Sequence, residues 1–164
     1  MSGAASWAFR EEDANRIQVI LDQLLAEANA RTALVVDRAG QMLATAGEQP
    51  NFDPVAFASL TAADFSANDQ LARMLGEPEF GALFHQGERE SLYLADVARR
   101  VILVVRFDNR TTLGLVKLRV RSVVERLTVL FTDIFERRDS QPPPRVEAAF
   151  LGEAEDEIDK LFGA

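Results

Sequence analysis

The sequence predicts an α/β (α+β) domain with the element order α-β-β-α-β-β-β-α and a five-stranded antiparallel sheet. Three long segments repeat apolar residues at helical spacing, and five short segments are strand candidates, the first of which, 32–37, is apolar and β-branched. Turn-forming residues separate most of the short segments by a few positions, which favours hairpins. The chain has 164 residues, of which 48% are hydrophobic, and this is sufficient for one buried core.

The first and third helices are each expected to bury one apolar stripe. The first spans about residues 11–29, and the third runs from Thr111 or Thr112 to about Arg138. In both, apolar residues return every three or four positions. The stripe of the first helix consists of Ile17, Ile20, Leu21, Leu24, Leu25 and Ala28. The stripe of the third helix consists of Val116, Val120, Val123, Leu127, Leu130, Phe131 and Ile134.

The second helix is expected over about residues 54–75, with Asp53 as its cap, Pro54 in its first turn and Gly76 at its end. It is rich in small residues, which either let a partner approach closely or pack tightly on the helix's own sheet or a second copy. Its small residues include Ala62, Ala63, Ser66 and Ala67. Its apolar positions include Ala56, Leu60, Ala63, Ala67, Leu71, Met74 and Leu75.

The five strands are expected to build a sheet with exposed edges. Hairpin turns connect the first two strands and the last three, and the second helix crosses between the two groups. Because the edges of so small a sheet invite pairing with another copy, we expect a homodimer. The strand segments are 32–37, 41–46, 81–86, 91–97 and 100–107.

The charge distribution argues against nucleic acid as a partner. The net charge is −8, whereas proteins that bind a phosphate backbone present a basic surface. Residues 139–164 hold seven acids and two bases, whereas residues 106–126 hold six bases and two acids. The domain therefore contains a basic stretch, and the C-terminal segment is acidic.

The sequence offers little for catalysis, and we expect no enzyme, no metal and no cofactor. It has no cysteine, one histidine and no phosphate-binding loop of the G-x-x-x-x-G-K-[ST] type. His85 lies in an expected strand, where a structural, hydrogen-bonded role is more common than a catalytic one. Arg110 is expected to anchor its loop rather than enter a partner's phosphate site as an arginine finger. A carboxylate pair is not expected among the turn residues Glu88, Glu90, Asp96 and Asp108.

The sequence also predicts a cytoplasmic protein without direct membrane insertion. Its longest aliphatic run, "VILVV" at 101–105, is far shorter than the roughly 20 residues that a membrane helix requires. The N-terminus lacks a basic region followed by an apolar one, so no secretory signal is expected.

Four strings stand out along the chain: "LVVDRAGQMLATAG" (34–47), "FASLTAAD" (57–64), "FHQGERESLYL" (84–94) and "VILVVRFDNRTTLGLVKLR" (101–119). Through them the sequence resembles the roadblock/light-chain family over about residues 12–135. The segment 155–162, "EDEIDKLF", also resembles the end of a bacterial subfamily that regulates a Ras-like polarity GTPase. The strings within 84–94 and 101–119 are long, which makes the resemblance specific to that subfamily.

The resemblance implies a roadblock-type homodimer with two sheets joined edge to edge and two second helices forming a platform for one GTPase. Such a dimer activates GTP hydrolysis without an arginine finger, by moving the GTPase's own catalytic residues into place. The alternative is a scaffold dimer that holds a GTPase or a cargo complex. The platform corresponds to Ala63, Asp64, Ser66, Ala67 and Gln70. Arg16, Lys117 and Arg121 are expected to support the platform or face the GTPase.

The predicted organisation is a flexible N-terminus (1–10), the roadblock domain (11–138), a Pro-rich linker (139–150) and a partner-binding C-terminal helix (151–164). The last segment is too short to form a stable helix alone and is expected to fold on docking; the alternative is a solubilising tail. The resemblance implies a second contact with the GTPase, favouring nucleotide exchange or retention. Its stripe consists of Leu151, Ala154, Ile158, Leu161 and Phe162, with Ile158, Leu161 and Phe162 as anchors.

Truncation after Arg145 is expected to leave the dimer folded and to weaken its binding to the GTPase. The reason is that a linked second contact raises the apparent affinity of the first. Calorimetric titration of the GTPase into the full and truncated chains measures the difference. Equal affinities would contradict the second contact.

Overall fold

The structure is a computed structural model that describes residues 9–140, apart from the side chain of Asp139. The fold predicted from the sequence is confirmed, with each element within one or two residues of its expected bounds. The elements are α1 (Glu11–Ala28), β1 (Thr32–Asp37), β2 (Met42–Gly47), α2 (Pro54–Met74), β3 (Ala82–Gln86), β4 (Glu90–Val97), β5 (Val101–Asp108) and α3 (Leu113–Asp139). Compact units comprise residues 1–134 and 135–164. The domain limits drawn from the sequence stay a prediction.

The five strands form one antiparallel sheet in the order β2-β1-β5-β4-β3. β1 and β5 lie at its centre, where Leu34 pairs with Val104 and Val35 with Leu103. These central strands are buried over most of their length, because helices cover both faces of the sheet. β2 and β3 are the edge strands, each with one neighbour within the described residues.

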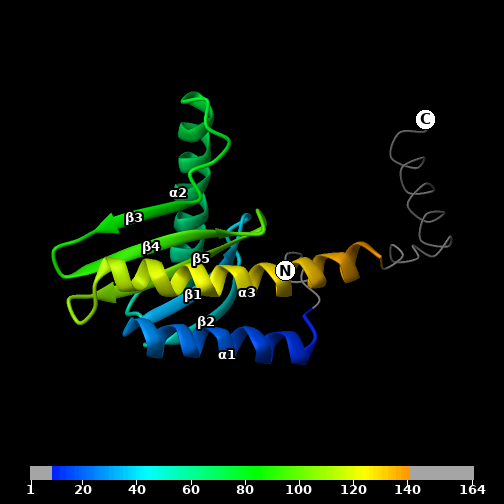
Figure 1. Ribbon diagram of the computed structural model, residues 1–164, viewed down its shortest axis with the longest axis horizontal. Coiled ribbons are helices and arrows are strands. Elements are labelled where there is room, and N and C mark those ends of the chain that lie inside the picture. Colours follow the sequence, from blue (N-terminus) through cyan, green and yellow to red (C-terminus); the bar gives the residue numbers. More distant parts are fainter. Residues whose placement is uncertain (1–8, 141–164) are drawn as a thin grey trace, which may run out of the picture. The chain divides into compact units, whose positions relative to one another are not determined.

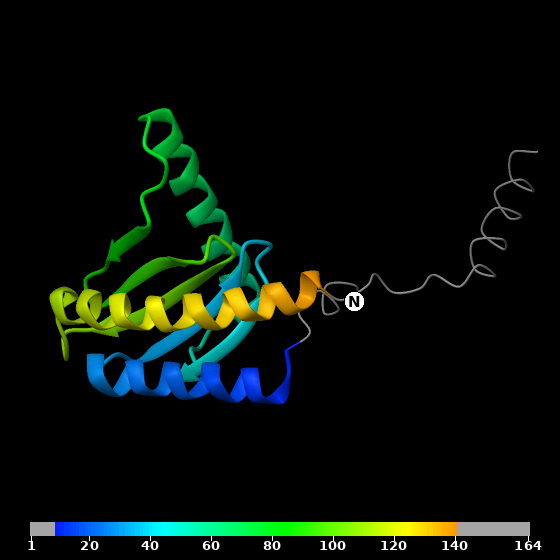
Figure 2. The ribbon, with the colours of Figure 1, turned by 45° about the vertical axis from the view of Figure 1, so that its right-hand side comes forward.

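Helix α2 covers one face of the sheet, and α1 and α3 lie side by side on the other (Figures 1 and 2). On the α2 face, Ala58 and Phe65 pack in one cluster with Leu34 and Val104. Because side chains alternate along a strand, neighbours such as Val105 face α1 and α3. The stripes predicted for α1 and α3 are buried, with Leu25 half-buried.

The predicted helix ends are also confirmed. The carboxylate of Asp53 accepts a hydrogen bond from the N–H of Val55 at 3.0 Å, and Pro54 occupies the first turn of α2. Gly76 has a φ of 78°, the left-handed region that ends helices at glycine. At the start of α3, Thr112 Oγ1 accepts a hydrogen bond from the N–H of Leu115 at 3.2 Å.

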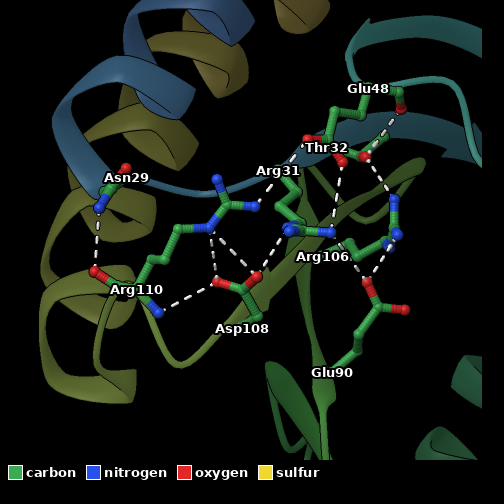
Figure 3. Close-up of polar contacts among 8 residues, drawn as sticks. All are labelled: Asn29, Arg31, Thr32, Glu48, Glu90, Arg106, Asp108 and Arg110. Carbon is green, nitrogen blue, oxygen red and sulfur yellow. Dashed lines mark hydrogen bonds and ion pairs between the residues drawn. The ribbon is translucent and has the colours of Figure 1, made fainter.

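Arginines and carboxylates form a network at the end of the sheet where β5 finishes and β4 begins (Figure 3). Arg31 Nε lies 2.7 Å from Asp108 Oδ2, and Arg106 Nη2 lies 2.6 Å from Glu90 Oε1. Arg106 Nη1 also donates to Thr32 Oγ1 at 3.2 Å. Glu90 and Asp108 are therefore both engaged by arginines.

Asp108 is the most strongly held carboxylate of this network. A hydrogen bond from the backbone N–H of Arg110 lowers its pKa, and the guanidinium of Arg110 and the charge of Arg31 act in the same direction. Partial desolvation of the carboxylate opposes them. The ionised form therefore stabilises the folded state, and this contribution is lost when the pH falls through the lowered pKa.

Asp108→Asn is expected to make the free energy of unfolding depend less on pH under acidic conditions. The wild type should lose more unfolding free energy than the variant between about pH 5 and pH 3, because only the wild type loses the ionised carboxylate. Urea denaturation at several pH values measures this difference, with Glu88→Gln at an exposed turn as the control. Parallel profiles of the wild type and Asp108→Asn would rule out the stabilising role.

Candidate functional site

Helix α2 carries a second apolar stripe on the side that faces away from its own sheet. The core-facing residues are Ala58, Thr61, Ala62, Phe65, Asn68 and Ala72. The exposed stripe comprises Ala56, Leu60, Ala63, Ala67, Leu71 and Met74. Leu60, Leu71 and Met74 are 69%, 56% and 82% exposed. Exposed apolar stripes of this kind are typical of interaction surfaces.

The apolar positions named from the sequence thus belong to the exposed face of α2 and not to its core face. The structural reason is that both sides of this helix repeat small or apolar residues every three or four positions. Of the small residues, Ala62 is buried, whereas Ala63, Ser66 and Ala67 are exposed. The packing alternative therefore applies to Ala62, and the other three remain available to a second chain.

The far end of α2 projects beyond the sheet (Figures 1 and 2). Leu75, which follows the helix, is 73% exposed, and Phe80 before β3 is 40% exposed. Near the other end of α2 lies a pocket of about 350 Å³ whose lining includes Phe57 and Leu92. The α2 side of the domain thus offers both a projecting apolar end and an apolar hollow.

The five predicted platform residues occupy the middle of this face and its two flanks. Ala63 and Ala67 lie in the exposed stripe, and Gln70 is exposed beside it. Asp64 lies on the flank toward β3, where its carboxylate contacts Nε2 of His85. Ser66 lies on the opposite flank and lines a hollow of about 360 Å³. The lone histidine therefore holds a carboxylate, consistent with the structural role expected for it.

Arg38 is a residue of this site that the sequence did not reveal. Its Nη1 lies 2.7 Å from Asp69 Oδ2 of α2, and its Nη2 contacts Asp96 of β4. Its guanidinium carbon lies 4.7 Å from the centre of the Phe65 ring. Arg38 thus ties the β1–β2 turn to α2 and β4 beside Ser66. These partners are distant in the sequence, so no local spacing could have identified the contact.

The predicted basic residues do not join the α2 face. Arg16 belongs to α1, and Lys117 and Arg121 belong to α3, so all three are carried by the helices on the other face of the sheet. Any contact that they make with a partner involves a different surface of the domain. Their role stays a prediction.

Arg110 anchors its loop. Its Nε lies 3.3 and 3.2 Å from the two carboxylate oxygens of Asp108, and its carbonyl oxygen accepts a hydrogen bond from Asn29 Nδ2 at 2.9 Å (Figure 3). Half of the side chain is exposed, but its guanidinium is engaged. To act as an arginine finger, it would first have to leave Asp108.

The described part of the chain shows neither a metal-binding cluster nor a membrane-spanning helix. Between residues 9 and 140, no cluster of histidine, aspartate and glutamate is arranged to hold a metal ion. None of the helices in this range is long and apolar enough to cross a membrane. The predicted anchors Ile158, Leu161 and Phe162 lie outside the described residues.

Comparison with solved structures identifies close relatives of this fold. The MglB of Myxococcus xanthus is 44% identical, with a TM-score of 0.69, and the match covers 72% of this chain and 96% of that one. The gliding protein MglB of Thermus thermophilus is 34% identical, with a TM-score of 0.72 and coverage of 78% and 97%. An MglB structure with a tetrameric arrangement is 33% identical, with a TM-score of 0.73 and coverage of 79% and 97%.

The sequence gives the same assignment. Residues 16–107 match the family model of the Roadblock/LC7 domain, whereas a search of curated proteins returned no match. The matched range runs from α1 to β5 and includes the whole of α2 with its exposed stripe. The chain therefore belongs to the Roadblock/LC7 family, and within that family it is similar to MglB proteins.

Proposed function

We propose that this protein is a GTPase-activating regulator of a Ras-like bacterial polarity GTPase similar to MglA, and that it acts as a homodimer in cell polarity and motility. The observation that carries the proposal is the exposed apolar face of α2 in a chain 44% identical to an MglB. The protein itself is not an enzyme in this proposal. Two copies bind one GTPase in the cytoplasm, at a cell pole.

Two features of the α2 side support the homodimer: the exposed apolar stripe of α2 and the outer edge of β3. The stripe is exposed, and among residues 9–140 no strand pairs with the outer edge of β3, on the side where α2 projects. A two-fold axis beside β3 joins the two sheets and lays the two α2 helices against each other. The projecting Leu71 and Met74 of one copy then lie over the sheet of the other. The small side chains of Ala63 and Ala67 allow the helices to approach closely.

Leu60→Asp combined with Leu71→Asp is expected to produce a folded monomer. A carboxylate buried in an apolar interface costs several kcal/mol, which raises the dimer Kd by at least about 100-fold. Sedimentation equilibrium measures the association, and circular dichroism checks the fold. The matched control is Val129→Asp, an apolar residue of α3 that is 73% exposed outside the stripe. A double variant that remains dimeric would show that the interface lies elsewhere.

The proposed mechanism uses position and not new chemistry. An activator that binds one arrangement of a GTPase more tightly than the others shifts its population toward that arrangement. Aligning the attacking water with the GTPase's own groups lowers the barrier to hydrolysis. A pair of packed helices is a rigid surface suited to hold a mobile loop. Asp64 and Ser66, on the two flanks of the stripe, remain available when Ala63 and Ala67 are covered by the second copy.

Ser66→Arg is expected to abolish GTPase binding and activation while the dimer stays folded, because a long cation fills the shallow flank of α2. Single-turnover GTP hydrolysis by the MglA-like protein, with and without saturating dimer, measures activation. The matched control is Ser122→Arg, at an exposed serine of α3. Activation that survives Ser66→Arg would place the platform on another face.

Arg110→Ala separates this mechanism from one that uses an arginine finger. Loss of a finger reduces the hydrolysis rate by a factor of about 10³ or more, even at saturation. We expect the Arg110→Ala dimer to retain activation within about threefold once binding is saturated, because its guanidinium serves the loop. A fall in the hydrolysis rate by a factor of about 10³, in an Arg110→Ala dimer that still binds the GTPase, would contradict the mechanism.

The second candidate function is a scaffold that holds a GTPase or a cargo complex without changing a rate. The apolar face of α2 supports association equally well in that case. The hydrolysis assay separates the two, because a scaffold binds the GTPase and leaves the rate unchanged. The C-terminal contact through Ile158, Leu161 and Phe162, with a role in exchange or retention, belongs to the proposal in either case.

A further inference from the structure

The basic stretch of residues 106–126 is divided by the fold into engaged and free cations. Arg106 pairs with Glu90 at 2.6 Å and Arg110 with Asp108 at 3.2 Å. On α3, two further arginines contact α1: Arg119 lies 3.8 Å from Glu27, and Arg126 donates to Gln23 at 2.9 Å. Lys117 and Arg121 form no ion pair with any residue between 9 and 140.

The two free cations lie on the same flank of α3. They are four residues apart, so both point away from α1 and toward the β3–β4 side of the sheet. There they line a groove of about 340 Å³. Its remaining lining residues include Ala82, Tyr93 and Val124. The cations of this stretch that the described residues leave unpaired thus lie beside one hollow.

The groove is open and partly apolar. Ala82 and Ala95 form part of its lining with small side chains. Apart from Gly81 and its two chain neighbours, no heavy atom of the described residues lies within 4 Å of the position that a Cβ of Gly81 would take. Val120 and Val124 provide an apolar side on α3. Figures 1 and 2 show that β3 lies beyond α3 at the edge of the sheet, where α1 does not reach.

The pKa of Tyr93 reflects both the burial and the positive charge of the groove. Burial raises the pKa of its hydroxyl, and the nearby charge of Arg121 lowers it. The phenol of Tyr93 and the guanidinium of Arg121 therefore lie close to each other in the groove. Two acids also line the groove, but Asp96 is engaged by Arg38 and by the backbone N–H of Arg99. Among the charged residues that line the groove, Glu125 is then left as one acid beside the two cations Lys117 and Arg121.

We infer that the groove between α3 and the β3–β4 hairpin is a second binding surface, which takes an acidic amphipathic segment of a partner protein. Carboxylates of the segment pair with Lys117 and Arg121, and its apolar side chains enter between Tyr93 and Val124. The surface is separated from α2 by the sheet, so it is distinct from the proposed GTPase platform. It does not depend on the proposed function.

An acidic protein segment fits the groove better than a nucleic acid or an anionic membrane. Both of those ligands require a broad basic surface, whereas this domain is acidic and offers two cations beside a narrow hollow. The small residues and the valines lining the groove suit the insertion of apolar side chains. A segment with carboxylates beside apolar residues satisfies both parts.

The test uses the full chain and a fluorescent helical peptide of about four turns, with glutamates on one face and leucines on the other. We expect Lys117→Glu combined with Arg121→Glu to weaken binding by at least about tenfold. The matched control, Arg126→Glu, makes the same change on the opposite flank of α3 and should stay within about twofold. Fluorescence anisotropy measures affinity, and circular dichroism checks the fold.

Two further readouts locate the bound peptide. Amide shifts in NMR spectra should concentrate at Gly81, Ala82 and Tyr93. Tyr93 is the only tyrosine of the chain, so its absorbance follows its ionisation directly. Bound carboxylates should raise its pKa, and Arg121→Gln should raise it without the peptide, because Arg121 lowers it now.

Several results would overturn the inference. These are no binding at low salt, equal losses in the charge-reversed and control variants, or amide shifts confined to α2. Equal affinity for a peptide with glutamine at every glutamate position would show that the cations are not used. Stronger binding of a single-stranded oligonucleotide or of phosphatidylserine vesicles at the same groove would show that the ligand class is wrong.

Discussion

Helix α2 has two apolar faces, and its own sheet can cover only one of them. Phe65, Ala58 and Ala62 complete the core, so the rotation of the helix about its axis is fixed by burial. Leu60, Leu71 and Met74 are then left in water by the same rotation. Turning the helix to hide them would expose Phe65. None of the residues between 9 and 140 covers this face, and both the proposed dimer and the proposed platform use it.

The order and bounds of the elements could be predicted from the sequence because their signals are local. Short apolar runs and turn residues placed the strands, Asp53 and Pro54 marked the start of α2, and Thr111 or Thr112 marked the start of α3. The stripes of α1 and α3 were predicted because each of these helices has one apolar face. The orientation of α2 could not be predicted in this way, since a helix with two apolar stripes gives the same periodicity whichever stripe is buried.

The candidate site was only partly predictable, because its geometry depends on contacts between distant segments. The positions in α2 were recognised through resemblance, and the structure spreads them over a stripe and two flanks. The contacts of Arg38 with Asp69 and Asp96 join three elements and leave no trace in local spacing. The basic stretch of residues 106–126 could be seen in the sequence, but the sequence did not show which of its cations are paired. Only the fold shows that four of its cations are engaged and that Lys117 and Arg121 form no ion pair with the residues that the structure describes.

The sheet separates the two proposed surfaces and also connects them through β3. Alternation places His85 on the α2 side of this strand, where it contacts Asp64, and places Ala82 on the groove side. Among residues 9–140, β3 pairs with β4 alone, so one of its edges is left without a strand partner there. A segment bound in the groove can alter the platform only if it prefers one position of β3. Pairing of β3 with a second copy would fix the position of this strand. Binding in the groove would then have no effect on the platform.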